Sequence, residues 1–221
     1  MDRGDPFCKW GDLDTAHGGM KLDDFATKGM EMAHLRRDQV FALRLYTCTP
    51  VSFALNAPLR AYKRDAKGEV VKPVAIEAPH PFPLTISTIQ EAVKQLRAAD
   101  EALQQKGEES GPKREEEVNL WRGVKNMAVP KDFLLQGGVE TGAMSTSREL
   151  KTALFYSHSK HSLIFKFVTR SFMERGADVA WLSAFPGEKE VLFPPLTYLS
   201  PTGRTQKVGD RFTIVEVTPR L

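Results

Sequence analysis

Hydrophobic side chains in the first part of the chain recur every three or four residues, the spacing of one helical face. This pattern predicts a helix beginning near Leu22 and a second running from Arg36 to Tyr46. Pro50 should end the second helix, because proline disfavours helical geometry in the residue before it. A third helix is expected around Phe53 to Tyr62, started or interrupted near Pro58.

The clearest helix signal follows a proline-rich connection, 67–83, which we expect to be exposed. Ser87 or Thr88 can cap this helix, and Glu91 completes a capping box with Thr88. One apolar stripe then continues from Ile89 to Leu103. The polar stretch 104–117 that follows predicts a solvated loop.

After Glu117 the pattern changes to short runs rich in β-branched and aromatic residues, which is typical of strands. A helix from about Arg148 to Tyr156 interrupts them. The predicted strands are 118–122, 162–168, 179–182, 191–193, 196–199 and 212–217. Helices first and strands afterwards indicate an α+β protein.

Composition adds limits to this picture. The 221 residues are 41% hydrophobic and 27% charged, which suits one domain with its own core. We expect a flexible N-terminus over 1–20 and a single domain over 21–221. This domain would comprise a helical lobe (21–106), a loop (107–117) and a β-rich core (118–221).

Charge and cysteine content argue against several partner classes. A formal net charge of +3 without a basic cluster argues against nucleic-acid and anionic-membrane binding. Cys8 and Cys48 suggest neither a disulfide framework nor a zinc site. No signal-peptide pattern or membrane-spanning run is visible, so a cytoplasmic protein is expected.

Common catalytic motifs are missing from the sequence. There is no GxGxxG, phosphate loop, GxSxG elbow or HExxH pattern. His158 and His161 lie three residues apart without a third ligand nearby, so we predict no metal site.

Two polar features occur near predicted strands. Arg122 and Gly123 end the first strand, where arginine can bind a phosphate and glycine lets a ligand approach the main chain. An arginine at a sheet margin is the structural alternative. Ser145, Thr146 and Ser147 precede the helix, where hydroxyls either cap it or point into a cleft.

A third feature is a pair of carboxylates. If the backbone there is extended, Glu188 and Glu190 face the same side and perturb each other's charge. An exposed edge strand is the structural alternative. Tyr156 could present its ring to a flat heterocycle, although a tyrosine at the core boundary is also common.

Taken together and in this order, the arginine, the Ser-Thr-Ser segment and Glu-x-Glu resemble the R-S-E signature of clostridial-toxin-like mono-ADP-ribosyltransferases. The resemblance covers about Val118 to Val217. It implies two small β-sheets packed together with an NAD cleft between them, preceded by a helical N-terminal lobe. The implied reaction transfers ADP-ribose from NAD to a protein arginine, with NADP as a possible substitute and without a metal.

The resemblance also implies cofactor contacts. Arg122 would hold a phosphate of NAD, and the main chain of Gly123 would meet the nicotinamide carboxamide. Thr146 and Ser147 would support the turn and contact the ribose side. Tyr156 would stand against the nicotinamide ring.

Three further residues would have catalytic roles under the same resemblance. Ser145 would aim Glu190, the indispensable carboxylate, which can stabilise positive charge on the ribose. Glu188 would engage the acceptor, and glutamate at this position implies arginine as the target.

Other functions fit the same residues. An NAD glycohydrolase would use water as the acceptor, and a catalytically silent NAD-binding module would keep only the fold. A two-carboxylate glycosidase is disfavoured, because carboxylates two residues apart do not straddle a sugar.

Overall fold

The computed structural model describes residues 15–60, 63–64, 70–71, 79–107 and 117–221. Most of the predicted flexible N-terminus and nearly all of the predicted loop 107–117 lie outside these described residues. Much of the proline-rich connection 67–83 also lies outside them, apart from 70–71 and 79–83. The two-residue strand β2 (Val70–Val71) lies in this connection and pairs with β1 (Lys63–Arg64), which precedes it.

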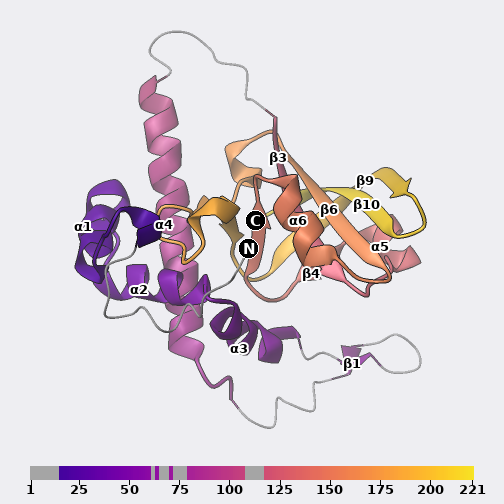
Figure 1. Cartoon of the computed structure of the whole chain (residues 1–221), viewed down its shortest axis with the longest axis horizontal. Helices are drawn as coiled ribbons and strands as arrows, with labels where there is room; N and C mark the ends of the chain where they lie inside the picture. The colour runs from indigo at the N-terminus through magenta and orange to yellow at the C-terminus, as the bar shows by residue number, and fades with distance from the viewer. Residues whose placement is uncertain (1–14, 61–62, 65–69, 72–78, 108–116) are drawn as a thin grey trace.

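The described residues before β3 include four α-helices: α1 (Leu22–Ala33), α2 (Arg37–Tyr46), α3 (Thr49–Arg60) and α4 (Pro83–Gly107). Figure 1 shows α4 as a long rod with α1 and α2 beside it and the sheet beyond it. None of the helices in the described part of the chain combines the length and apolar character needed to cross a bilayer.

Two helices begin earlier than the sequence predicted. The fourth helix begins at Pro83 and not at the expected cap Ser87 or Thr88. Proline fits the first helical position because the first N–H groups of a helix have no intrahelical partner. The third helix begins at Thr49 and accommodates Pro58 in its last turn.

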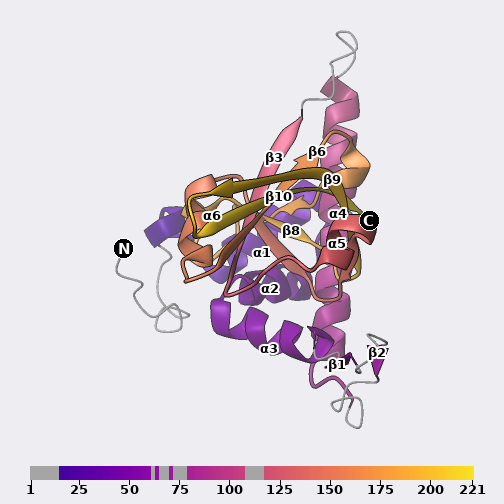
Figure 2. The same ribbon diagram turned by 90° about the vertical axis from the view of Figure 1, so that its right-hand side faces the viewer.

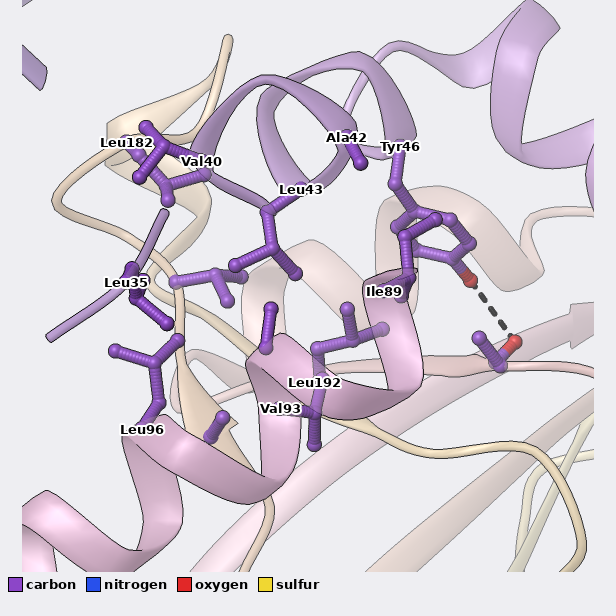
Figure 3. Close-up of a cluster of buried hydrophobic side chains, with 14 of the residues drawn as sticks. Leu35, Val40, Ala42, Leu43, Tyr46, Ile89, Val93, Leu96, Leu182 and Leu192 are labelled. Atoms are coloured by element: carbon purple, nitrogen blue, oxygen red, sulfur yellow. Dashed lines mark hydrogen bonds between the residues drawn. The ribbon is translucent and has the colours of Figure 1, made fainter. Parts of the chain in front are cut away.

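The apolar stripes of these helices meet in one core. Leu35, Val40 and Leu43 pack with Ile89 and residues further along α4 (Figure 3). Leu182 and Leu192, from the second half of the chain, belong to the same fully buried cluster. The helical part is therefore packed directly onto the strand that begins with Glu190 and contains Leu192.

Among the described strands, eight form one hydrogen-bonded sheet in the order β4-β9-β10-β6-β3-β5-β8-β7. All neighbours are antiparallel except β6 and β10, which are parallel. The strands are β3 (Val118–Lys125), β4 (Gly138–Glu140), β5 (Met144–Ser147), β6 (Ser162–Thr169), β7 (Ala177–Asp178), β8 (Glu190–Phe193), β9 (Thr197–Val208) and β10 (Phe212–Arg220). Figure 2 shows β9 and β10 side by side.

Short helices connect the strands of the sheet: α5 (Lys131–Gln136), α6 (Leu150–Ser157) and the 3₁₀ helices η5 (Phe172–Glu174) and η6 (Pro186–Glu188). A further 3₁₀ helix, η2 (Thr15–His17), precedes α1.

The sheet folds onto itself at its centre. A single residue pair, Trp121 with Ser147, joins β3 to β5. Phe167 of β6 and Phe193 of β8 nevertheless stack with ring centres 5.8 Å apart, although β3 and β5 separate their strands in the sheet. The α+β prediction is confirmed, and the two expected sheets are two packed halves of one hydrogen-bonded sheet.

Several strand boundaries differ from the prediction. The segment 179–182 is not a strand but a turn after β7. Its apolar side chains Val179 and Leu182 are buried in the core formed with the helices, which explains the apolar pattern. The first strand continues past Gly123 to Lys125, and the strand predicted at 196–199 extends to Val208.

Candidate active site

A cleft of about 890 Å³, counting its space open to solvent, lies where β3 and β5 diverge after their single pair. Its walls come from the end of α2, α3, β3, β5, α6, η6 and the start of β8. All eight residues singled out from the sequence line this cleft: Arg122, Gly123, Ser145, Thr146, Ser147, Tyr156, Glu188 and Glu190.

Arg122 projects from β3 toward β5. Its Nη1 donates a hydrogen bond to the main-chain oxygen of Ser145 at 2.7 Å. Burial lowers the pKa of this guanidinium, and the positive charge of Arg60 lowers it further, while Glu140 opposes the shift. Arginine nevertheless keeps its charge in proteins, so the cleft contains a fixed cation.

Gly123 has a packing role that the sequence did not reveal. A Cβ atom there would lie 1.9 Å from the main-chain oxygen of Ala153 and 2.7 Å from the nitrogen of Ser157. Both atoms belong to α6, so only glycine lets this helix lie directly against β3. That close approach brings Tyr156, from the same helix, to the cleft.

The Ser-Thr-Ser segment is a strand, β5, and not the turn expected from the sequence. The Ser145 hydroxyl influences the pKa values of Glu190 and Tyr46, where it opposes the rise that burial causes. The Thr146 hydroxyl donates to the Val191 oxygen at 2.8 Å, so this side chain ties β5 to β8. The Ser147 hydroxyl donates to the main-chain oxygen of Glu188 and accepts from the main-chain nitrogen of Glu149.

The backbone from Glu188 to Glu190 is not extended, so the condition under which the two carboxylates would face the same side of a strand is not met. Glu188 ends η6, and Glu190 begins β8. Between them Lys189 has a left-handed backbone with φ of 46°. The alternation of a strand therefore does not apply, yet both side chains line the same cleft.

Glu190 is 7% exposed, and its pKa is raised to about 7. Burial is the main cause, because it disfavours the charged form, and the negative charge of Glu188 adds to the shift. Hydrogen bonds from Ser145 and Ser183 and the charge of Arg122 oppose it. The Ser183 bond is long, at 3.4 Å. This carboxyl group therefore changes protonation near neutral pH.

Glu188 is held by α6. The Tyr156 hydroxyl donates to its two carboxylate oxygens at 2.9 and 3.1 Å. Glu188 and Tyr156 are therefore in direct contact. The resemblance implies that the first engages the acceptor and that the second stands against the nicotinamide ring.

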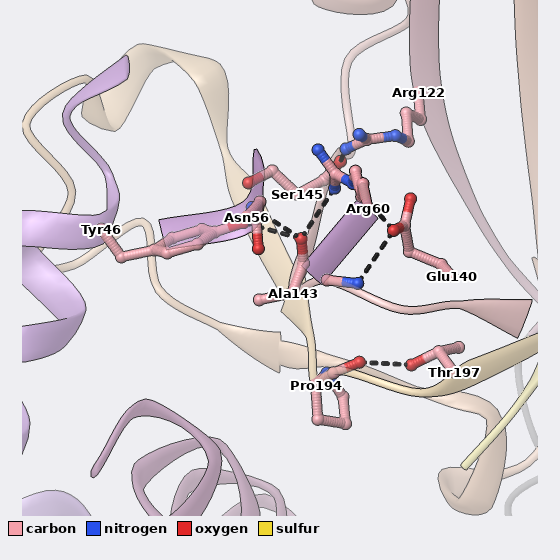
Figure 4. Close-up of polar contacts among 10 residues, drawn as sticks. Tyr46, Asn56, Arg60, Arg122, Glu140, Ala143, Ser145, Pro194 and Thr197 are labelled. Carbon is pink, nitrogen blue, oxygen red and sulfur yellow. Dashed lines mark hydrogen bonds and ion pairs between the residues drawn. The ribbon is translucent and has the colours of Figure 1, made fainter. Parts of the chain in front are cut away.

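Residues of the helical lobe that the sequence analysis missed form the opposite wall. The hydroxyl of Tyr46, Nδ2 of Asn56 and Nη2 of Arg60 all donate to the Ala143 oxygen, at 2.9, 3.1 and 3.2 Å (Figure 4). Arg60 also pairs with Glu140, with Nε 2.8 Å from Oε1.

A pattern in α3 could have indicated this wall. Ser52, Asn56 and Arg60 follow each other at intervals of four, which places three polar side chains on one helical face, and all three line the cleft. Ser183, also missed, carries no comparable signal. Within the described residues, no group of three His, Cys, Asp or Glu side chains could hold a metal ion.

No protein-family model and no curated protein sequence matches the chain. Solved structures do match. The ADP-ribosyltransferase HopU1 of Pseudomonas syringae pv. tomato superposes with a TM-score of 0.60 at 14% identity, covering 91% of this chain and 88% of HopU1.

Two further structures resemble the chain to a similar degree. The Vis toxin of Vibrio splendidus, an ADP-ribosyltransferase solved with agmatine, gives a TM-score of 0.56 at 18% identity, with coverage of 90% and 83%. Exoenzyme S of Pseudomonas aeruginosa, solved with human 14-3-3 protein beta and carba-NAD, gives 0.53 at 18%, with coverage of 92% and 87%. The chain therefore has the ADP-ribosyltransferase fold.

Proposed function

We propose that this protein is a mono-ADP-ribosyltransferase of the R-S-E class that transfers ADP-ribose from NAD to a protein arginine. The observation that carries the proposal is the meeting of Arg122, Ser145, Glu188 and Glu190 in one cleft of a chain with this fold. The solved complexes of Vis with agmatine, which bears a guanidinium, and of exoenzyme S with carba-NAD are consistent with it.

The β3 side of the cleft would hold the cofactor. Arg122 would bind the NAD diphosphate, since a guanidinium matches phosphate oxygens in charge and geometry. β3 pairs with β5 only at Trp121, so the main chain at Gly123 could meet the nicotinamide carboxamide. Thr146 and Ser147 would shape the ribose side, and the ring of Tyr156 would stand against nicotinamide.

Glu190 would act on the ribose. Breaking the bond between C1′ and the nicotinamide nitrogen leaves positive charge on the sugar, while the cationic pyridinium departs as neutral nicotinamide. A carboxylate bound to the 2′-hydroxyl stabilises that charge as it develops. Ser145 would keep Glu190 aimed at the ribose.

Glu188 would act on the acceptor. A guanidinium nitrogen forms the new bond to C1′ and loses a proton, which Glu188 can accept. Glu188 also attracts the cationic arginine side chain before reaction. Without an acceptor, water could attack the same sugar, which would give NAD hydrolysis in the same cleft.

The test incubates purified protein with adenine-labelled NAD, with and without agmatine, and measures both nicotinamide and labelled agmatine. We expect nicotinamide release in both samples and an ADP-ribosyl adduct in the second. Parallel reactions with labelled NADP determine whether it can replace NAD. Absence of nicotinamide release would overturn the proposal, and release without an adduct would reduce it to NAD hydrolysis.

Glu188→Gln is the matched variant, because it keeps the shape of the side chain and removes its charge. It should lose most of the agmatine adduct while retaining most NAD hydrolysis. An equal loss of both products would contradict the separate acceptor role of Glu188.

A further inference from the structure

The hydrogen bonds between Tyr156 and Glu188 point to a function beyond a contact with the cofactor. We propose that the Tyr156 hydroxyl positions the Glu188 carboxylate for the acceptor guanidinium, so that Tyr156 is a determinant of the acceptor site. This inference rests on the proposed function, in which Glu188 receives the arginine.

The geometry fixes both ends of Glu188. The Tyr156 hydroxyl lies 2.9 and 3.1 Å from its two oxygens, so one donor is shared by the whole carboxylate and limits its rotation. The main chain is held separately: its oxygen accepts from the Ser147 hydroxyl, and its nitrogen donates to the Phe185 oxygen at 2.9 Å. The side-chain anchor comes from α6, and the Ser147 anchor comes from β5.

Such anchoring matters because a glutamate side chain is long. Glutamate loses much rotamer freedom when it is ordered, and an unanchored carboxylate would have to be ordered as the acceptor binds. The left-handed Lys189 that follows also sets the direction of the chain between the two carboxylates. Preorganisation by Tyr156 would therefore favour productive arginine binding.

The bond also limits how an acceptor can approach. The Tyr156 hydroxyl lies nearly equidistant from both oxygens of Glu188, so it occupies the edge of the carboxylate. A guanidinium that donates two parallel hydrogen bonds to a carboxylate would need that same edge. A carboxylate accepts about four hydrogen bonds, so each oxygen has further acceptor capacity on its flank. The guanidinium would then meet one oxygen from the side, presenting the nitrogen whose proton is removed.

Tyr156→Phe separates this function from a ring contact with nicotinamide. Phenylalanine keeps the ring and its edge contact with Phe155, whose ring centre lies 5.6 Å away at an interplanar angle of 89°. Only the hydroxyl is lost. The function of the ring in cofactor binding should therefore survive while Glu188 loses its anchor.

The experiment measures agmatine transfer at saturating NAD, and NAD hydrolysis without acceptor. For Tyr156→Phe we expect kcat/KM for agmatine to fall about tenfold, because one hydrogen bond to a charged group is lost. NAD hydrolysis and the KM for NAD should each change by a smaller factor than kcat/KM for agmatine, because the variant keeps the ring that would face nicotinamide. Equal losses in transfer and hydrolysis, a rise in the KM for NAD as large as the loss in transfer, or improved transfer would each overturn the inference.

A double substitution shows whether Tyr156 acts through Glu188. In a Glu188→Gln background, adding Tyr156→Phe should change the residual transfer by less than about twofold, because the two residues act as one unit. A further tenfold loss would overturn the inference, since about tenfold is the effect expected with Glu188 intact.

Tyr198→Phe is the matched control. It removes a hydroxyl that donates to the Gln136 oxygen outside the cleft, so it should leave transfer and hydrolysis unchanged. Wild-type protein that releases no nicotinamide would overturn the proposed function and this inference together. Normal wild-type transfer with an unchanged Tyr156→Phe variant would overturn this inference alone.

Discussion

The two walls of the cleft differ in the polar groups that they contain and in the contacts of those groups. On the helical wall (Tyr46, Asn56 and Arg60), three donors converge on one main-chain oxygen. On the sheet wall (Ser145, Glu188 and Glu190), a buried carboxylate has a long bond to Ser183 and a second carboxylate nearby.

We infer from this difference that the helical wall is structural and that the sheet wall contains the reactive group. The helical wall joins α2 and α3 to the chain before β5, and the charge of Arg60 is balanced by Glu140. Its polar groups therefore stabilise the fold. The sheet wall buries Glu190 beside Glu188, which destabilises the charged form of Glu190 and makes it available to a developing positive charge. A variant of the helical wall should thus lower stability and change activity little, whereas loss of the Glu190 charge should lower activity and raise stability above neutral pH.

Glu190→Gln should have the largest effect. We expect nicotinamide release to fall about 1000-fold, because an amide cannot stabilise positive charge on the ribose as a carboxylate does. The measurement is the initial rate of nicotinamide release at saturating NAD. Near wild-type turnover would contradict the assignment of Glu190.

The same variant should gain stability above neutral pH. The carboxyl pKa is about 7 in the folded protein, against an ordinary value of 4.5 for glutamate. The folded state therefore binds the proton more tightly, and stability falls as pH rises between these values. The amide does not ionise, so at pH 8 Glu190→Gln should be more stable by up to about 3 kcal/mol. Urea unfolding at about pH 5 and pH 8 measures this, and an equal difference at both pH values would contradict it.

Gly123→Ala should lower the free energy of unfolding by about 1–3 kcal/mol, because the added Cβ would collide with the main chain of α6. Gly187→Ala is the matched control: no atom lies within 4 Å of its added Cβ. Urea unfolding should show a change within about 0.5 kcal/mol for this control. Equal stability of the two variants would contradict the packing described for α6.

Arg122→Lys tests whether the guanidinium binds a phosphate of NAD through two parallel hydrogen bonds. Lysine keeps the charge but lacks the planar arrangement of donors, so the KM for NAD should rise about tenfold. Arg204→Lys, at an exposed site on β9, is the control. An unchanged KM in Arg122→Lys would argue against phosphate binding by Arg122.

Tyr46→Phe tests the helical wall and should have the smallest effect on activity. It removes the buried hydroxyl that donates to the Ala143 oxygen and accepts from Asn56. The free energy of unfolding should fall by about 1–2 kcal/mol, while nicotinamide release changes less than about threefold. A large loss of activity with unchanged stability would reverse the contrast between the walls.

The sequence was most informative where chemistry and spacing agreed. Arg122, Ser145 and Glu190 were assigned to one cleft because a rare combination of residue types occurs in a fixed order, and the structure brings them together. Strands such as 162–168 were found because their apolar residues are continuous and β-branched or aromatic.

Other features depended on contacts that a linear pattern does not contain. The left-handed backbone of Lys189, between a 3₁₀ helix that ends at Glu188 and a strand that begins at Glu190, has no signal in the sequence pattern. The polar face of α3 was visible in the sequence, but its contact with the chain before β5 was not, because Asn56 and Ala143 are 87 positions apart. The turn at 179–182 was mistaken for a strand because burial in a helical core also selects apolar residues.

The pH dependence of kcat/KM for NAD hydrolysis tests the central claim most directly, because it reports groups that titrate in the free enzyme. We predict a rise with pH through a midpoint near 7, as the buried Glu190 ionises. In Glu188→Gln the midpoint should move to lower pH, because a neighbouring negative charge is removed. A rate that is flat or falls as pH rises from about 5 to 8 would contradict this claim, since the ionised Glu190 would then not be the reactive form.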